Sequence, residues 1–152
     1  MKLDDNSALC EAVSLATRYH RGQVDKAGEA YILHIMRVIV RLKCPEDQIV
    51  AALHDIIEDT PCEMEDLRMA GFSINTLSAI DSLTRRKGEK YKTYVRRCCQ
   101  DPTAARVKMA DVKDHLAHNR WRLTEEHRKR YRWAEVYVEN MIAMHQESKV
   151  ES

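Results

Sequence analysis

Apolar residues recur at intervals of three and four along most of the chain, which is the spacing of one face of an α-helix. In the first such segment they are Leu9, Ala12, Val13, Ala16 and Tyr19. The spacing continues toward the C-terminus and predicts helices at 7–21, 31–42, 45–60, 64–70, 73–83, 91 onward, 103–118 and 124–145. We therefore predict an all-α bundle of seven to eight helices.

Residues at the expected helix ends fit these boundaries. Pro45 suits a first turn, and the acidic Glu46 and Asp47 are favourable at the positive N-terminal end of a helix dipole. Gly71 ends the short helix before it, and Ser73 is placed to cap the helix that follows. Local sequence signals therefore support the helical periodicity.

The composition favours the same fold. The chain has 152 residues, 44% of them hydrophobic, with only 4 Gly and 3 Pro, too few turn residues for an all-β protein or an α/β barrel. We expect a single domain over 1–152, with its core at about 5–145. The net charge of +1 gives no basic footprint of the kind that nucleic-acid binders carry, so a nucleic-acid partner is not expected.

The expected location is the cytoplasm, with no membrane partner. No apolar run approaches the roughly 18 residues that cross a bilayer, and the N-terminal MKLDDNSALC carries acids where a signal peptide has basic residues. The 5 Cys are an odd number without a C-x-x-C pair. This pattern predicts reduced thiols rather than disulfides or a structural zinc site. The sequence leaves the oligomeric state open.

Candidate chemistry is concentrated in the segment LHDIIEDT. His54 and Glu58 are four residues apart, as are Asp55 and Asp59, so on one continuous helix each pair shares a face. Three carboxylates this close together are electrostatically costly unless a cation lies among them. Because apolar residues surround them, we expect a cation site here rather than a solvated acidic end of a helix.

Two further polar residues interrupt apolar helical segments: His34 in YILHIMRVIV and Asp111 in RVKMADVKDHLAH. With His54 and Asp55 they form a set of two imidazoles and two carboxylates. Mixed ligands of this kind, without thiolate, suit manganese, iron, magnesium or zinc. Four ligands from three helices can leave coordination positions open for water or a phosphate oxygen.

The order of these residues, H…HD…D, resembles that of the HD-domain metal phosphohydrolases. HDIIEDT is similar to the HDxxEDT segment of the alarmone hydrolases related to the RelA/SpoT hydrolase domain, which include the metazoan SpoT homologues. The flanks agree, since RGQVDKAGEAYILH resembles that branch's GQ-x-x-K-x-GE-x-YI-x-H segment and RVKMADVKDHL its VKLAD-x-x-N segment. The resemblance covers about 5–145 and indicates a small stand-alone alarmone hydrolase built on one HD domain.

This resemblance implies a site and a reaction. The implied metal ligands are His34, His54, Asp55 and Asp111. Glu58 and Asp59 match the pair that positions and deprotonates the attacking water. The implied substrate is guanosine tetra- or pentaphosphate, which loses its 3′-pyrophosphate. The implied metal is manganese, with iron, magnesium, zinc and cobalt as alternatives.

The residues expected at the substrate site match the family pattern less closely than the metal ligands do. Lys26 matches a basic residue that contacts the substrate near the metal. Asp25 stands where many longer relatives place an Arg that helps to hold the guanine base, and an acid cannot stack as a guanidinium does. His115 replaces the usual Asn four residues after Asp111, but it can still donate a hydrogen bond. We expect Lys26, Asp25 and His115 to line the substrate site, and the departures leave the nucleotide open.

Two other functions fit the same residues. One is a phosphatase that acts on another phosphorylated nucleotide or dinucleotide, and the other is a metal- or nucleotide-binding module without turnover. The basic segment 85–92 is either a solvated loop or a rim that steers phosphates toward the site. Trp121 follows the Asp111 segment closely enough to approach a bound base.

Overall fold

The structure, a computed structural model, describes residues 3–118 and 122–152. Its helices are α1 (Asp5–Tyr19), α2 (Tyr31–Val40), α3 (Pro45–Leu53), α4 (Ile56–Asp59), α5 (Met64–Met69), α6 (Ile74–Leu83), α7 (Tyr91–Cys98), α8 (Pro102–His118) and α9 (Glu125–Val150). The predicted all-α fold is confirmed. Over the described ranges there are nine helices and one isolated β-bridge, between Val24 and Ala30. The ninth helix arises because the segment predicted as one helix at 45–60 is divided into α3 and α4.

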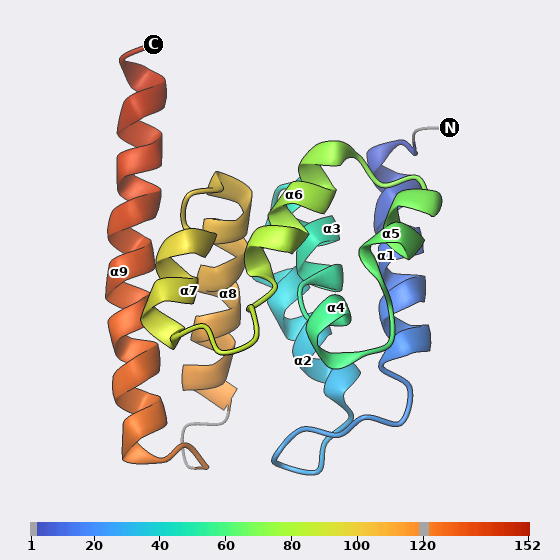
Figure 1. The fold of residues 1–152 in the computed structure, drawn as a ribbon, viewed down its shortest axis with the longest axis horizontal. Coiled ribbons are helices and arrows are strands. Elements are labelled where there is room, and N and C mark those ends of the chain that lie inside the picture. The colour runs from blue at the N-terminus through green and yellow to red at the C-terminus, as the bar shows by residue number, and fades with distance from the viewer. Residues whose placement is uncertain (1–2, 119–121) are drawn as a thin grey trace.

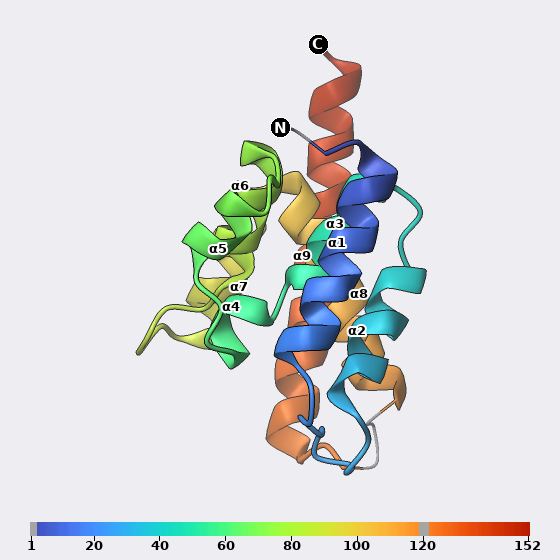
Figure 2. The same ribbon diagram turned by 90° about the vertical axis from the view of Figure 1, so that its right-hand side faces the viewer.

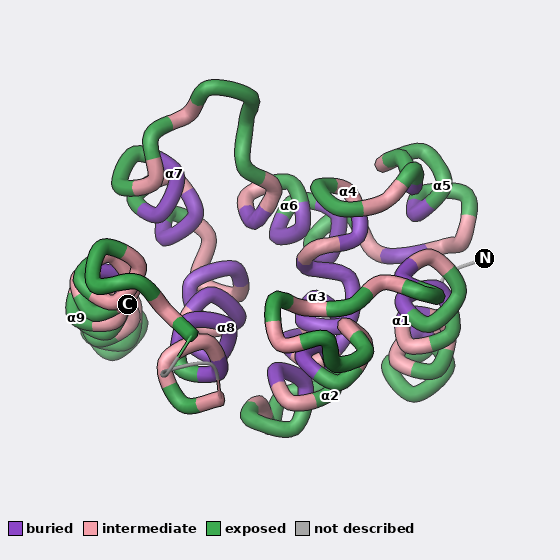
Figure 3. The backbone as a smooth tube through the Cα atoms, turned by 90° about the horizontal axis from the view of Figure 1, so that it is seen from below, coloured by how far each residue is buried: buried purple, intermediate pink, exposed green. Residues whose placement is uncertain are grey.

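The central helix of the bundle is α3. It packs against α1, α2, α6 and α8, and Figure 1 shows it between α1 on one side and the α7–α9 group on the other. Residues 49–53 are all buried, because a helix surrounded by other helices has no solvated face. Seen from below in Figure 3, buried backbone follows α3 and the inner sides of α2 and α8, while exposed backbone lies at the periphery. A polar side chain at the end of α3 therefore enters a largely apolar interior.

A two-residue turn, formed by His54 and Asp55, separates α3 from α4. Asp55 has φ −107° and ψ 0°, away from ideal helical values, so the first helix ends at Leu53 and the next begins at Ile56. The prediction of one continuous helix was wrong at this point. On such a helix, consecutive side chains diverge by about 100°, whereas the turn brings His54 Nε2 to 2.9 Å from Asp55 Oδ2.

The remaining boundaries follow the capping signals. Ser73 caps α6, as predicted, by accepting a hydrogen bond from the backbone N–H of Thr76 at 3.1 Å. Thr124 caps α9 in the same way by accepting from the N–H of His127. The helices α8 and α9 pack against each other, and α9 extends past the rest of the bundle toward the C-terminus (Figures 1 and 2). Although α9 has 26 residues, none of the described helices is both long and apolar enough to cross a bilayer.

Candidate metal centre

Three segments far apart in the chain bring the predicted ligands together. His34 comes from the middle of α2, His54 and Asp55 from the turn after α3, and Asp111 from the middle of α8. His34 and His54 are each only 3% exposed and Asp111 only 5%, while Asp55 is half-buried. The four side chains therefore meet in the interior, where polar atoms need partners.

The distances between their donor atoms fit a single shared site. Oδ1 of Asp111 lies 3.2 Å from Nε2 of His34 and 3.6 Å from Nε2 of His54. Oδ2 of Asp55 lies 2.9 Å from Nε2 of His54 and 3.8 Å from Nε2 of His34. Two imidazole nitrogens and two carboxylate oxygens thus surround one point. The structure brings the four predicted ligands together, and their role as ligands stays a prediction.

Both imidazoles are oriented by a partner behind them. Nδ1 of His34 lies 2.8 Å from a carboxylate oxygen of Asp114, and Nδ1 of His54 lies 2.7 Å from the carbonyl oxygen of Ala51. Each of these oxygens can only accept, so both Nδ1 atoms carry the proton and donate it. In the neutral rings the Nε2 atoms are left with their lone pairs directed into the shared site. A ring with its proton on Nδ1 can bind a metal through Nε2. A hydrogen bond from Nδ1–H to an oxygen is the usual way in which proteins fix this tautomer in metal-ligating histidines.

Three of the converging atoms have no hydrogen-bond partner although they are buried. They are Nε2 of His34, Nε2 of His54 and Oδ1 of Asp111. Buried acceptors that face one another are unfavourable unless a positive charge lies between them. A divalent cation meets this requirement, and the donor set of imidazole and carboxylate suits such an ion. The residues present therefore fit a divalent metal.

The pKa values of the two histidines also indicate that the cluster attracts positive charge. Burial by itself lowers the pKa of His34, but the carboxylates of Asp111 and Asp114 outweigh it and raise that pKa to about 9. Burial likewise opposes charge on His54, and Asp55 and Asp111 raise its pKa well above the usual value. The cluster thus attracts positive charge strongly enough to overcome the desolvation of two imidazoles.

A buried lysine supports the Asp111 carboxylate from its other side. Nζ of Lys108 lies 2.9 Å from Oδ2 of Asp111, and the same ammonium lies 5.0 Å from the ring centre of Tyr94. Burial raises the pKa of Asp111, but Lys108 and then His115 lower it well below its usual value. Sequence reasoning missed Lys108. The signal that could have found it is a lysine three residues before the aspartate in an otherwise apolar segment.

A tyrosine supports Asp55 in a similar way. The hydroxyl of Tyr31, at the start of α2, donates a hydrogen bond to Oδ2 of Asp55. Asp55 is held ionised, since burial raises its pKa but His54 outweighs that effect and lowers it below the usual range. Sequence reasoning also missed Tyr31, because nothing in the local sequence connects it with a carboxylate 24 positions away.

Glu58 and Asp59 lie on α4, at the exposed side of the centre. Carboxylate oxygens of Asp55, Glu58 and Asp59 lie within 4.8 Å of one another. Oε1 of Glu58 accepts a hydrogen bond from the backbone N–H of Arg85 at 2.9 Å, which joins α4 to the basic segment 85–92. Burial, and then the charges of Asp55 and Glu58, raise the pKa of Asp59 to about 6. An acidic pair thus adjoins the predicted metal ligands on the side that solvent reaches.

His115 lies next to the predicted metal ligands. Its Nε2 is 3.1 Å from Oδ1 of Asp111, and its ring centre is 4.8 Å from that of His34. The ring also stacks on Tyr131 of α9, with ring centres 4.9 Å apart and planes inclined by 6°. This position also allows His115 to act as a further ligand to a metal held by His34 and Asp111.

Asp25 and Lys26 lie in the loop between α1 and α2, and the structure does not place their side chains on the four predicted ligands. Oδ1 of Asp25 accepts hydrogen bonds from the N–H groups of Ala27 and Glu29, at 2.7 and 3.0 Å, and so shapes the loop. The side chain of Lys26 is exposed and forms no ion pair with any residue in the described ranges. Trp121 lies outside the described residues.

Comparisons with known proteins agree with the geometry. No family model matches the chain. The chain is 30% identical over 134 residues to "GTP pyrophosphokinase" of Streptomyces coelicolor and 30% identical over 122 residues to "Bifunctional (p)ppGpp synthase/hydrolase SpoT" of Escherichia coli. These alignments cover 80% and 71% of the chain but only 16% and 17% of the relatives. The chain therefore spans about one sixth of the length of these curated proteins.

A solved structure has the same fold. It is described as a metazoan ortholog of SpoT that hydrolyses ppGpp, and it matches with a TM-score of 0.72 over 90% of this chain and 85% of its own. The sequence identity of that pair is 21%, so the likeness concerns the fold. Sequence and fold thus lead to the same group, and the chain belongs with the SpoT-type HD domains.

Proposed function

We propose that this chain is a divalent-metal-dependent hydrolase that removes the 3′-pyrophosphate of guanosine tetra- or pentaphosphate, with manganese as the metal. The observation that carries the proposal is the convergence of three buried ligand atoms that form no hydrogen bond, on His34, His54 and Asp111. The names of the relatives, which include "Guanosine-3′,5′-bis(diphosphate) 3′-pyrophosphohydrolase" of Aquifex aeolicus at 28% identity, support the choice of substrate. The proposed unit of activity is the single domain 1–152.

The ligands in this proposal are His34, His54, Asp55 and Asp111. A divalent cation held by them would lower the pKa of a water molecule and polarise a phosphoryl oxygen. Asp114 and the Ala51 carbonyl keep both Nε2 lone pairs directed at the cation, which avoids reorganisation when it binds. Lys108 holds Asp111 ionised and in place.

Glu58 and Asp59 supply the proton chemistry. In the proposed reaction their carboxylates orient the attacking water and accept its proton as its oxygen bonds to the 3′ α-phosphorus. The bond from that phosphorus to the ribose 3′ oxygen breaks, the ribose oxygen takes a proton, and pyrophosphate leaves. The position of both acids on α4, within reach of Asp55 and open to solvent, supports this role.

The proposed substrate side consists of Lys26, Asp25 and His115. Asp25 fixes the shape of the loop that presents Lys26, so its contribution would be made through the loop backbone. His115, clamped between Asp111 and the ring of Tyr131, is placed to donate a hydrogen bond to a phosphate oxygen or to bind the metal. Because Asp25 and His115 both depart from the family pattern, the alternative substrate is another phosphorylated nucleotide or dinucleotide.

A turnover assay tests the proposal. Purified protein with Mn²⁺ is incubated with guanosine tetraphosphate and, in parallel, with other nucleoside polyphosphates and dinucleotides, and products are separated by anion exchange. We expect GDP and pyrophosphate in equal amounts, loss of turnover on chelation, and recovery when Mn²⁺ is returned. Orthophosphate as the product would support the phosphatase alternative. Metal binding without turnover on any of these compounds would support the non-catalytic module and overturn the proposal.

A further inference from the structure

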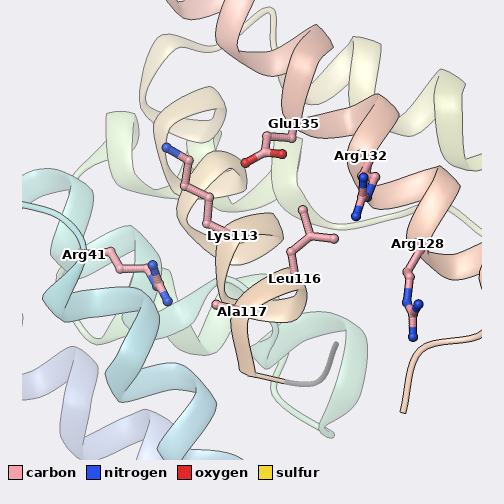
Figure 4. A pocket seen from close by; sticks show the side chains of 7 residues that line it. All are labelled: Arg41, Lys113, Leu116, Ala117, Arg128, Arg132 and Glu135. Atoms are coloured by element: carbon pink, nitrogen blue, oxygen red, sulfur yellow. The ribbon is translucent and has the colours of Figure 1, made fainter. Parts of the chain in front are cut away.

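A second polar cavity lies away from the metal centre, between the end of α2, the outer face of α8 and the first half of α9. Its volume is about 700 Å³, within the usual size of small-molecule sites. Figure 4 shows side chains from the three helices around this space, among them the cationic Arg41, Lys113, Arg128 and Arg132. Neither the predicted metal ligands nor Glu58 and Asp59 line it.

The two sites lie on different faces of α8. Asp111 and His115, four residues apart, face the metal centre. Lys113 and Ala117, also four residues apart, face the cavity. With about 100° of rotation per residue, Lys113 lies roughly 200° around the helix from Asp111. The cavity and the predicted metal ligands therefore lie on opposite sides of α8.

The cavity carries a local excess of positive charge. Four cations and one carboxylate, that of Glu135, surround it, although the whole chain has a net charge of only +1. Within the part of the chain that the structure describes, neither Lys113 nor Arg132 forms an ion pair, and Arg41 reaches only Asp114, at 3.5 Å. The lining cations outnumber the one lining carboxylate, and this excess of like charge favours a bound anion.

The composition of the lining favours phosphate over a carboxylate or a halide. Three of the four cations are arginines, whose planar guanidinium groups bind phosphate oxygens in pairs, and Lys113 adds a compact point charge. Leu116 contributes an apolar wall between the two helices. A cavity with several phosphate-binding groups and one apolar wall suits a small molecule that joins phosphates to a less polar body.

We propose that this cavity is a second anion site, which binds a phosphorylated small molecule of nucleotide size independently of the metal centre. Its concave form between three helices distinguishes it from the extended basic stripe that tracks a nucleic-acid backbone. The site requires no metal, because the cations that line it are side chains of the protein. Binding there is expected whether or not the proposed hydrolysis takes place.

The test is an NMR titration of the full chain with inorganic pyrophosphate and with GDP, each with and without Mg²⁺. The cavity variant is Lys113→Ala/Arg132→Ala, and the control is Lys129→Ala/Lys149→Ala, which removes equal charge from exposed positions of α9. We expect backbone shifts at 113–117 and 128–135 without Mg²⁺. The dissociation constant should rise at least tenfold in the cavity variant and less than about twofold in the control.

Each other outcome counts against the proposal. Shifts confined to the surroundings of His34, His54 and Asp111, and only with Mg²⁺, would mean that the metal centre is the anion site. An equal loss of affinity in both variants would mean unspecific surface charge. Tighter binding of a short RNA than of GDP at the same residues would mean a nucleic-acid surface. If the alanine pair does not fold, Lys113→Gln/Arg132→Gln replaces it, since both side chains are exposed.

Discussion

Asp114 positions one metal ligand without lying at the centre itself. It is fully buried, and it accepts from Nδ1 of His34 through Oδ2 and from Nε of Arg37 through both carboxylate oxygens. Burial raises its pKa, but His34 and Arg37 outweigh this and lower it to about 2. The group therefore remains an anion throughout the neutral range and stabilises whatever positive charge His34 carries or binds.

We predict that Asp114→Asn weakens metal affinity about 10- to 100-fold, because the imidazole of His34 loses a charged partner and becomes a poorer ligand. Turnover at saturating Mn²⁺ should change much less. The measurement is activity and metal content as a function of Mn²⁺ concentration. Asp47→Asn is the matched control, since Asp47 is also buried and pairs with Arg106, at 2.7 and 2.8 Å, without contacting the centre. Equal metal affinity in the two variants would contradict the prediction.

Glu58 is predicted to act on the water and not on the metal. Glu58→Ala should lower kcat by a factor of about 10² to 10⁴, the usual contribution of a general base, and should leave the metal content unchanged. Steady-state kinetics and metal analysis of the same preparation test both parts. Glu139→Ala, at an exposed position of α9, is the control and should retain full activity. If Glu58→Ala loses its metal, the residue is a ligand and this assignment is wrong.

Single residues differ in how visible they are in the sequence. His34 and Asp111 stand out because each interrupts an apolar helical run, and the structure brings both to the same point. Asp114 and Tyr31 do not stand out, because each owes its role to a partner on another segment, whereas Lys108 is marked only by its spacing of three residues from Asp111. A sequence therefore reveals isolated anomalies more readily than the residues that support them.

At the scale of the helices, the division between α3 and α4 has the largest chemical consequence. Periodicity did not predict it, because the apolar spacing continues through it and no Gly or Pro marks it. The turn places His54 and Asp55 side by side and turns Glu58 and Asp59 toward solvent. At this turn Asp55 pairs with His34 of α2 and His54 pairs with Asp111 of α8, and such tertiary contacts can override local propensity.

A capping residue offers a test at this scale. Ser73→Ala should lower the free energy of unfolding by about 1 kcal/mol, because the N–H of Thr76 at the start of α6 loses its acceptor. Urea denaturation followed by circular dichroism measures the change. Ser78→Ala, an exposed substitution within the same helix, should change stability by less than about 0.5 kcal/mol. Equal urea midpoints for Ser73→Ala and Ser78→Ala would contradict this prediction.

At the scale of the whole molecule, the order and type of the helices followed from the sequence, but their arrangement did not. The eight predicted segments together overlap all nine observed helices, with α3 and α4 sharing one segment, because periodicity reports which face of a helix is buried. Which helix lies against which is set by side-chain packing between distant segments. The central place of α3 was therefore not predicted, although it is what brings α2 and α8 close enough to share the centre.

Metal removal should affect the stability of the whole chain. A ligand at about 100 times its dissociation constant stabilises the folded state by about 2.7 kcal/mol, which corresponds to roughly 5–10 °C in Tm for a chain of this size. We expect chelation to lower Tm by this amount and added Mn²⁺ to restore it, as measured by differential scanning calorimetry. If Tm is unchanged although metal analysis verifies that the metal has been lost, the cluster does not need an ion to stabilise the fold, and this prediction is wrong.

The gain in Tm that metal binding produces should depend on pH. In the metal-free chain, the pKa of His34 is raised to about 9, from 6.5 when unfolded. Its contribution to stability is therefore complete below pH 6.5 and is lost as the pH rises toward 9. Metal binding displaces the same proton, so the gain in Tm on adding Mn²⁺ should be larger at pH 8 than at pH 6.5. A gain that shrinks with rising pH would contradict this linkage.

The bonds of Asp114 have an evolutionary consequence. The side chains that it meets, at positions 34, 37 and 41, follow one another along a single face of α2. A mutation at 114 leaves an imidazole and two guanidinium groups without their common anion, and no single compensating replacement repairs all three. As lineages diverge, 34, 37 and 114 should be inherited as one block.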